Sequence, residues 1–205
     1  MKLFITGIGT DVGKTIAAAI ITEALQADYW KPIQAGDLDN SDSHKIERYL
    51  SNTQSKIHPN SYRLHTPASP HLAAKLDGIT INLINIVEPK TKNHLVIEGA
   101  GGVLVPLNDT DCIIDLIQSD YKVIVVSRHY LGSINHTLLT IEALRQRNIK
   151  VARIIFNGDE NQATESIILH KTGIKMIGRI NDEPYFDANV VAEYADTFRE
   201  NLQNL

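Results

Sequence analysis

The residues with the clearest chemical signature form a glycine-rich segment near the start of the 205-residue chain. The segment reads Thr6-Gly7-Ile8-Gly9-Thr10-Asp11-Val12-Gly13-Lys14-Thr15 and joins an apolar run to a helical pattern. Glycines let backbone amides turn toward one anion, and a helix that begins there adds its positive end. We therefore expect a phosphate-binding loop, with Lys14 on the outer phosphates of a nucleotide and the Thr15 hydroxyl on Mg²⁺.

The spacing of this loop differs from the common form. Gly7 and Gly13 are six positions apart, and Ile8 stands where the first glycine usually lies. The alternative interpretation is a glycine-rich turn that binds no ligand. The Gly-Lys-Thr ending between a strand and a helix favours nucleotide binding.

Three further polar residues follow apolar runs or begin a helix. Lys31 ends the second apolar run, where it is either a solvated surface lysine or a second cation for the phosphate site. Asp42 begins a helical pattern, so a helix N-cap and a metal ligand are both open. Glu98 ends an apolar run and precedes a run of glycines, which favours a carboxylate close to Mg²⁺.

Short apolar runs that alternate with amphipathic segments predict the elements that position these residues. Strands are expected at residues 2–6, 29–34, 95–98, 123–127, 151–157 and 175–177, and helices at 14–26, 43–50, 134–147, 164–172 and 189–202. This alternation predicts an α/β fold in which right-handed crossovers place helices on both faces of a parallel sheet. Residues 51–70 read as a long loop, and residues 1–205 as one domain. Ligands should collect at the carboxyl ends of the strands.

Composition narrows the class of protein. Hydrophobic residues make up 43% of the chain, the formal net charge is -4, and no basic run is present. We therefore expect no nucleic-acid partner, and the lack of a long apolar stretch predicts no membrane span. The single cysteine, Cys112, allows no intramolecular disulfide, which fits a cytoplasmic protein.

Besides the phosphate loop, several further motifs occur in a fixed order along most of the chain. The full set comprises the longer phosphate loop Gly-x-x-Thr-Asp-Val-Gly-Lys-Thr, Lys31-Pro32, Asn40-Ser41-Asp42, Ser69-Pro70-His71, Glu98-Gly99-Ala100-Gly101-Gly102 and Leu131-Gly132-Ser133-Ile134-Asn135-His136. Together they resemble the dethiobiotin synthetase family, a group of single-domain enzymes of the P-loop NTPase type. The resemblance implies a homodimer with substrate at the subunit interface.

The resemblance also implies roles for individual residues. Lys14 and Lys31 are expected to act as catalytic cations, with Thr10 and Asp11 beside the phosphate and the diamine. Expected nucleotide contacts are Gly9, Thr10, Asp11, Val12, Gly13, Lys14, Thr15, Ile16, Glu98 and Asn157. Expected substrate contacts are Lys31, Ala35, Gly101, Gly102, Val103, Leu131, Gly132, Ser133 and Asn135, of which the Gly132–Asn135 turn comes from the second chain. Expected Mg²⁺ ligands are Thr15, Asp42 and Glu98. Ser133 is also expected to cap the helix that it begins.

Three positions depart from the family pattern. Ala35 stands where a Ser or Thr is common, so one hydroxyl contact to the diamine is missing. Asn157-Gly158 replaces the usual Asn-Asp at the base-recognition strand, and Gly178-Arg179-Ile180-Asn181 lacks the proline of a Gly-x-Ile-Pro element. The preferred nucleoside triphosphate therefore stays open.

The implied reaction converts 7,8-diaminononanoate and CO₂ or bicarbonate into dethiobiotin, a step of biotin synthesis that uses ATP as co-substrate. A carbamate attacks the γ-phosphate, and the neighbouring amine then closes a cyclic urea. Such chemistry depends on positioning and charge neutralisation. We expect Lys14→Gln or Lys31→Gln to fold normally and to lose roughly a hundred- to a thousandfold in rate.

Three other functions are less consistent with the sequence. Partitioning and division-site ATPases carry a signature lysine at the position of Gly9, which this chain lacks. A glutamine-dependent amidotransferase would need a nucleophilic cysteine, and Cys112 lies in no such motif. The lysines and carboxylates described above argue against a nucleotide-binding module that has lost its activity.

Overall fold

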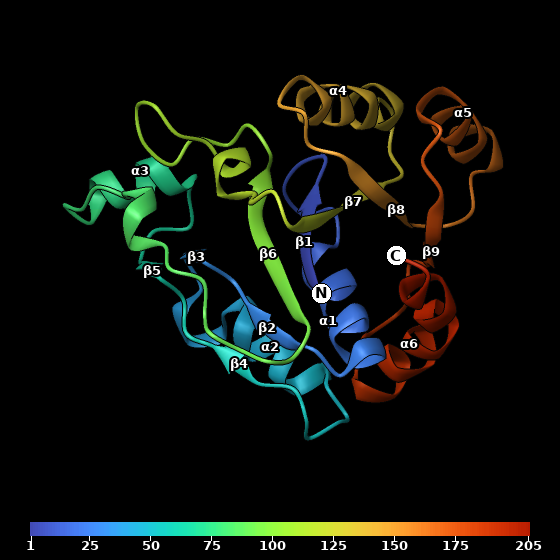
Figure 1. Ribbon diagram of the computed structural model, residues 1–205, viewed down its shortest axis with the longest axis horizontal. Helices are drawn as coiled ribbons and strands as arrows, with labels where there is room; N and C mark the ends of the chain where they lie inside the picture. The colour runs from blue at the N-terminus through green and yellow to red at the C-terminus, as the bar shows by residue number, and fades with distance from the viewer.

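The computed structural model describes the whole chain, from Met1 to Leu205. Seven strands form one sheet in the order β4-β2-β6-β1-β7-β8-β9 (Figure 1). Their bounds, in that order, are Ile57–His58, Asp28–Trp30, Leu95–Gly102, Lys2–Gly7, Tyr121–Arg128, Val151–Asn157 and Met176–Ile180. Every pair of neighbours is parallel, which confirms the predicted α/β class.

The central strands are apolar because both of their faces are covered. Leu3, Phe4 and Ile5 of β1 are fully buried, and so is the run 123–126 of β7. Such strands lack the alternation of a half-exposed sheet and read as continuous Val- and Ile-rich runs. Because these runs are continuous, the strands predicted from them agree with β1, β7 and β8 to within about two residues at each end.

The helices lie in two layers around this sheet. In Figure 1, α1 (Lys14–Leu25), α2 (Asp42–Tyr49) and α6 (Ala188–Gln203) pack together on one side. The other side carries α4 (Ser133–Gln146) and α5 (Gln162–Thr172). All five agree with the predicted helices to within two residues. No helix combines the length and the apolar character that a transmembrane span requires.

The predicted strand 29–34 is wrong as a single element. The chain leaves the main sheet after Trp30, and β3 (Ile33–Ala35) pairs with β5 (Tyr62–Leu64) in a separate two-stranded parallel sheet. Pro32 lies at the break and has no N–H to donate to a ladder. Its carbonyl instead accepts hydrogen bonds from the N–H groups of Ser61 and Tyr62.

The prediction of one long loop at residues 51–70 is also wrong in part. This segment contains β4 and β5, and α3 (Pro70–Leu76) begins at its end. Strands of two or three residues are too short to leave a readable pattern. Three short 3₁₀ helices, Leu38–Asn40, Leu83–Asn85 and Ile113–Leu116, were likewise not predicted.

Candidate active site

A cavity of about 990 Å³ opens where the central strands end. Its lining includes residues that follow or end β1, β2, β6, β7, β8 and β9, as expected for an open parallel sheet. Twelve of the predicted site residues line it: Thr10, Asp11, Gly13, Lys14, Thr15, Ile16, Lys31, Ala35, Asp42, Glu98, Gly101 and Asn157. Segments far apart in sequence therefore converge on one space.

The phosphate loop connects β1 to α1 and is braced by β8. Gly13 has a φ of 92°, and a Cβ atom there would lie 2.4 Å from Nδ2 of Asn157. That amide nitrogen donates a hydrogen bond to the carbonyl of Val12 at 3.0 Å. Only glycine fits position 13, because both the backbone conformation and the neighbouring amide exclude a side chain.

Lys14 is buried at the base of the loop. Its Nζ donates to the carbonyl oxygen of Gly9 at 2.8 Å, and the residue is 7% exposed. Burial lowers the pKa of Lys14 to about 8, and the negative charge of Glu98 only partly opposes this shift. A phosphate anion beside the ammonium would favour its charged form. The Lys14 ammonium therefore lacks a full negative partner at the position where we expect a nucleotide phosphate.

Lys31 joins the two carboxylates that the sequence predicted as metal ligands. Its Nζ lies 2.5 Å from Oδ2 of Asp42 and 2.9 Å from Oε1 of Glu98. Burial alone would lower the pKa of Lys31, but the two carboxylates outweigh burial and raise it. Burial also opposes ionisation of Asp42, and Lys31 overcomes it to hold the pKa of Asp42 below its usual value. The interpretation of Lys31 as a solvated surface lysine is wrong.

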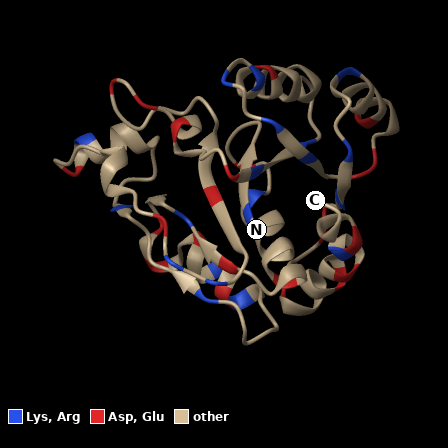
Figure 2. Cartoon of the chain, in the orientation of Figure 1, with Lys and Arg blue, Asp and Glu red and all other residues tan.

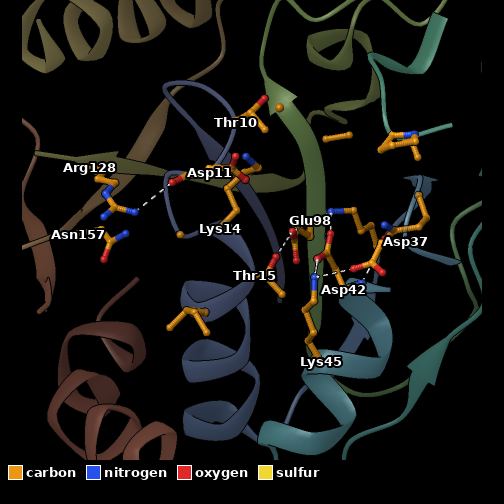
Figure 3. Close-up of a pocket in the computed structure, with 18 of the residues that line it drawn as sticks. Thr10, Asp11, Lys14, Thr15, Asp37, Asp42, Lys45, Glu98, Arg128 and Asn157 are labelled. Carbon is orange, nitrogen blue, oxygen red and sulfur yellow. Dashed lines mark hydrogen bonds and ion pairs between the residues drawn. The ribbon is translucent and has the colours of Figure 1, made fainter. Parts of the chain in front are cut away.

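Glu98 is held from two further directions. Thr15 Oγ1 donates to its Oε1 at 2.9 Å, and the fully buried Tyr29 donates to its Oε2 at 2.8 Å. Burial and the charge of Glu98 raise the pKa of Tyr29 well above its usual value, so Tyr29 stays a neutral donor. In Figure 2 a single red position interrupts the ribbon of β6, whose only charged residue is Glu98. Figure 3 shows Thr15, Glu98 and Asp42 gathered beside Lys14.

Asp42 does not cap α2. The N-cap is Ser41, which forms a capping box with His44, and Asp42 is the first helical residue. Its carboxylate is therefore available to Lys31 and to Lys45, whose Nζ lies 3.4 Å from Oδ1. The Asp42 side chain thus lines the cavity and does not cap the helix.

The oxygen atoms of Thr15, Asp42 and Glu98 suit a hard cation. No cluster of three His, Cys, Asp or Glu side chains could enclose a metal ion by itself. Mg²⁺ commonly takes one or two carboxylates and completes its shell with waters and substrate phosphates. Two carboxylates that share Lys31, and a hydroxyl bonded to one of them, lie beside the phosphate loop and fit that requirement.

The opposite ends of the cavity differ in character. At one end, Arg128 pairs in register with Asn157, and its guanidinium lies 3.4 Å both from the carbonyl oxygen of Asp11 and from Oδ1 of Asp182. Segment 181–183 and Phe186 complete this wall. The other end is lined by Ala35, Asp37 and residues 67–70. Figure 3 places Arg128 and Asn157 on one side of Glu98 and Asp37 on the other.

Several predicted contacts lie outside this cavity. Val103 is 4% exposed and belongs to the core, and Gly102 packs against the carbonyl of Gly7 in the phosphate loop. Val12 is also buried, and Gly9 faces Lys14 through its carbonyl. None of these four residues lines the cavity, although Gly9 and Val12 belong to the phosphate loop itself.

The predicted clamp on the substrate carboxylate does not line the cavity of the same chain. Leu131, Gly132, Ser133 and Asn135 are all absent from its lining. Leu131 and Asn135 are exposed, whereas Ser133 is 2% exposed. The predicted N-cap role of Ser133 is wrong, because Gly132 takes that position with a φ of 102° and Ser133 begins α4.

The sequence as a whole matches known proteins along nearly its full length. Residues 1–190 match the family described as AAA domain. The ATP-dependent dethiobiotin synthetase BioD of Christiangramia forsetii is 59% identical over 199 residues, which span 97% of this chain and 96% of the relative. The enzyme of the same description from Cytophaga hutchinsonii is 54% identical, with 95% of each chain covered. The chain belongs to the dethiobiotin synthetase family.

Solved structures agree with this membership at the level of the fold. A plasmid partition protein of Borrelia burgdorferi bound to AMPPNP has a TM-score of 0.61 at 14% identity and covers 100% of this chain and 98% of its own. The septum site-determining protein MinD of Pyrococcus horikoshii, complexed with Mg-ADP, has a TM-score of 0.60 at 12% identity, with 100% and 96% covered. These likenesses show a P-loop NTPase fold alone.

Sequence reasoning missed several residues that line the cavity of this family member. Arg128 and Asn181 directly follow the buried parts of β7 and β9, so their position at strand ends was a usable signal. Lys45 lies one helical turn after Asp42 and shares its face of α2. Asp37 and the segment 67–70 gave no such signal, because their approach depends on the unpredicted strands β3 and β5.

Proposed function

We propose that the chain closes the ureido ring of dethiobiotin from 7,8-diaminononanoate and CO₂, at the expense of ATP. The observation that carries the proposal is the convergence of Lys14, Lys31 and the Asp42–Glu98 pair on one cavity beside a phosphate loop. Family membership supplies the substrates. The whole chain acts as one P-loop domain, and we place the reaction in the cytoplasm.

The reaction proceeds in three balanced steps. One amine attacks CO₂ and loses a proton, which gives a carbamate. A carbamate oxygen then displaces ADP from the γ-phosphate and forms a carbamic–phosphoric anhydride. The second amine attacks the carbonyl carbon, phosphate leaves, and the nitrogen releases a proton as the five-membered cyclic urea closes. The bond between the second amine and the carbonyl carbon forms within one molecule, so this step needs no collision between two molecules.

Lys14 and Lys31 neutralise the charge that this sequence of steps creates. Lys14 binds the β- and γ-phosphates, and Lys31 binds the γ-phosphate and the carbamate. Thr10 and Asp11 lie at the loop position between the phosphate and the diamine. Preorganised cations of this kind act in phosphoryl transfer mainly through positioning and charge.

Thr15, Asp42 and Glu98 would hold Mg²⁺. Bound there, the ion would neutralise charge on the nucleotide phosphates and orient them. Lys31 then turns from the carboxylates toward substrate. Tyr29 still donates to Glu98 after that change, and Lys45 still lies beside Asp42, so both carboxylates keep a partner.

A second copy of the chain completes the substrate site. The turn at Gly132–Asn135 begins α4, whose first turn has no side-chain cap, and it carries an exposed Asn135. A helix start and an amide side chain suit a carboxylate. This turn lies outside the cavity of its own chain, so we propose that it binds the substrate carboxylate in a homodimer. Substrate would then lie across the subunit interface.

Measurement of phosphate release tests the proposed function. Release from ATP should require both 7,8-diaminononanoate and bicarbonate, and mass spectrometry should find dethiobiotin in equal amount to the phosphate. A repeat with GTP, CTP and UTP defines the nucleotide preference. Hydrolysis that neither compound stimulates would contradict the proposal and favour an ATPase of another kind.

A further inference from the structure

Two aspartates of the cavity have a backbone conformation that is uncommon for non-glycine residues. Four non-glycine residues have positive φ, and two of them, Asp11 at 55° and Asp37 at 52°, line this cavity. Positive φ is unfavourable for residues other than glycine, and such residues concentrate at functional sites. Asp11 belongs to the phosphate loop, whereas Asp37 has no role in the proposed reaction so far.

Asp37 does not cap a helix with its side chain, which is the usual structural role of an aspartate just before a helix. It precedes the 3₁₀ helix Leu38–Asn40 as its N-cap, yet its side chain makes no capping hydrogen bond. Its Oδ2 lies 3.3 Å from Nζ of Lys45, and its Oδ1 has no hydrogen-bond partner. The carboxylate is 53% exposed and faces the cavity. It keeps a free oxygen for a ligand.

Asp37 lies on the side of the cavity where the acceptor of the phosphoryl group must bind. Figure 3 shows Arg128 and Asn157 on one side of Lys14 and Asp37 beyond Glu98 on the other. In an in-line displacement the nucleophile approaches opposite the leaving group. With the nucleoside held near Asn157, ADP leaves toward that end, and the diamine must lie at the end that contains Asp37.

The other polar groups around this end are already engaged or neutral. Asp42 and Glu98 contact Lys31, and the Gln34 amide bonds to Gly36 and to the N–H of Asp42. Ala35 offers no polar side-chain atom. An alkyl amine is a cation at neutral pH, so it gains most from a carboxylate oxygen without a partner, such as Oδ1 of Asp37.

We propose that Asp37 binds the amino group of the diamine that is not carboxylated, as an ammonium, and thereby selects diamines over monoamines. The ammonium gives up one proton to solvent before it attacks the carbonyl as a neutral amine, and it gives up the second proton as the ring closes. This inference rests on the proposed function and assigns one further residue to it. The charge of the carboxylate also attracts the substrate before one amine loses its proton to react.

Kinetics of Asp37→Asn and Asp37→Gly test this assignment, with Asp39→Asn as the matched control. Asp39 is exposed, lies two residues away and does not line the cavity. We expect both Asp37 variants to raise the KM for 7,8-diaminononanoate about tenfold or more, because a hydrogen bond to a charged group contributes at least that much. The KM for ATP should stay unchanged in both variants, as should the melting temperature of Asp37→Asn and all constants of Asp39→Asn.

Single-amine inhibitors show which contact is lost. Wild type should bind the diamine more tightly than 7-aminononanoate or 8-aminononanoate, and this preference should fall about tenfold in Asp37→Asn for one of the two. Asp37→Gly removes the carboxylate but keeps the backbone conformation, because glycine accepts the left-handed region without strain. A change in KM in this variant therefore reports the loss of the side chain. A glycine variant with the wild-type KM for the diamine would overturn the assignment, and so would an unchanged preference in Asp37→Asn. A wild-type protein that releases no phosphate with the diamine would instead refute the proposed function.

Discussion

Nζ of Lys31 lies 2.5 Å from Oδ2 of Asp42, and the two side chains are only 6% and 18% exposed. A lysine expected to act on substrate is therefore also the counter-ion of a buried carboxylate. Removal of one partner from a buried ion pair leaves an uncompensated charge. This relationship changes what a substitution at Lys31 should do.

We expect Lys31→Gln to lose stability as well as activity, contrary to normal folding as first expected from the sequence. The free energy of unfolding should fall by roughly 2–4 kcal/mol, since Glu98 keeps Thr15 and Tyr29 as donors and Asp42 keeps Lys45 nearby. Urea unfolding measures the loss. The double variant Lys31→Gln/Asp42→Asn removes both charges and should recover part of the stability with no recovery of rate. Equal loss in the single and double variants would contradict this coupling.

Lys14→Gln should behave differently. Burial lowers the pKa of Lys14, so its charged form is disfavoured where it lies, and a neutral replacement should not lower the free energy of unfolding. Turnover should fall roughly a hundred- to a thousandfold, because the phosphates lose a preorganised cation. Steady-state phosphate release and thermal unfolding give the two readouts. Lys171→Gln, at an exposed position of α5, serves as the control and should match wild type in both.

Much of this site was accessible from sequence because its residues stand at the ends of buried strands. Lys14, Thr15, Glu98 and Asn157 each follow or end an apolar run, and parallel strands bring such positions together. The main sheet itself was predictable for the same reason. Continuous apolar runs bounded by glycine are readable without any structure.

The remaining parts of the site depend on contacts that no local pattern encodes. The break at Pro32 and the pairing of β3 with β5 bring Asp37 to the cavity, and both strands are only three residues long. The dual use of Lys31 was also hidden, since its partners lie 11 and 67 positions away. Such relationships follow from tertiary packing.

A metal requirement should be visible at Thr15. Thr15→Val keeps the shape of the side chain but removes the hydroxyl that donates to Glu98 at 2.9 Å. We expect Thr15→Val to raise the Mg²⁺ concentration for half-maximal rate about tenfold or more, by loss of one ligand, whereas Thr15→Ser should stay close to wild type. Titration of Mg²⁺ after removal of metal with EDTA measures both. Identical Mg²⁺ dependence in the two variants would exclude Thr15 as a ligand.

Stability at acidic pH should depend on Glu165, which is 8% exposed and contacts Arg179 and His129. Burial opposes its ionisation, but hydrogen bonds from Arg179 and His129 outweigh burial and lower the pKa of Glu165 below its usual 4.5. A lowered folded-state pKa stabilises the protein above the unfolded value, and the benefit is lost as pH falls through the folded value. The stability gap between wild type and Glu165→Gln should therefore be full above about pH 5 and shrink below pH 4.5.

Urea unfolding between pH 3 and pH 7 measures that gap. Glu142→Gln is the matched control, because Glu142 is exposed on α4 and makes no ion pair. Its stability difference from wild type should stay small and constant across the range. A gap for Glu165→Gln that does not change with pH would show that the side chain contributes through packing alone.

Mixed dimers should show whether Asn135 acts on the neighbouring active site. Lys14→Gln and Asn135→Ala should each be nearly inactive, the first through the phosphates and the second through the substrate carboxylate. If the turn at Gly132–Asn135 serves the other chain, a dimer with one variant of each kind contains one intact site and one doubly altered site. Random mixing in equal amounts should then restore about a quarter of wild-type activity, because half of the dimers are mixed and each has one working site. If Asn135 served its own chain, every site in the mixture would carry one defect, and no activity would return. The absence of Asn135 from the lining of its own chain's cavity favours the first outcome.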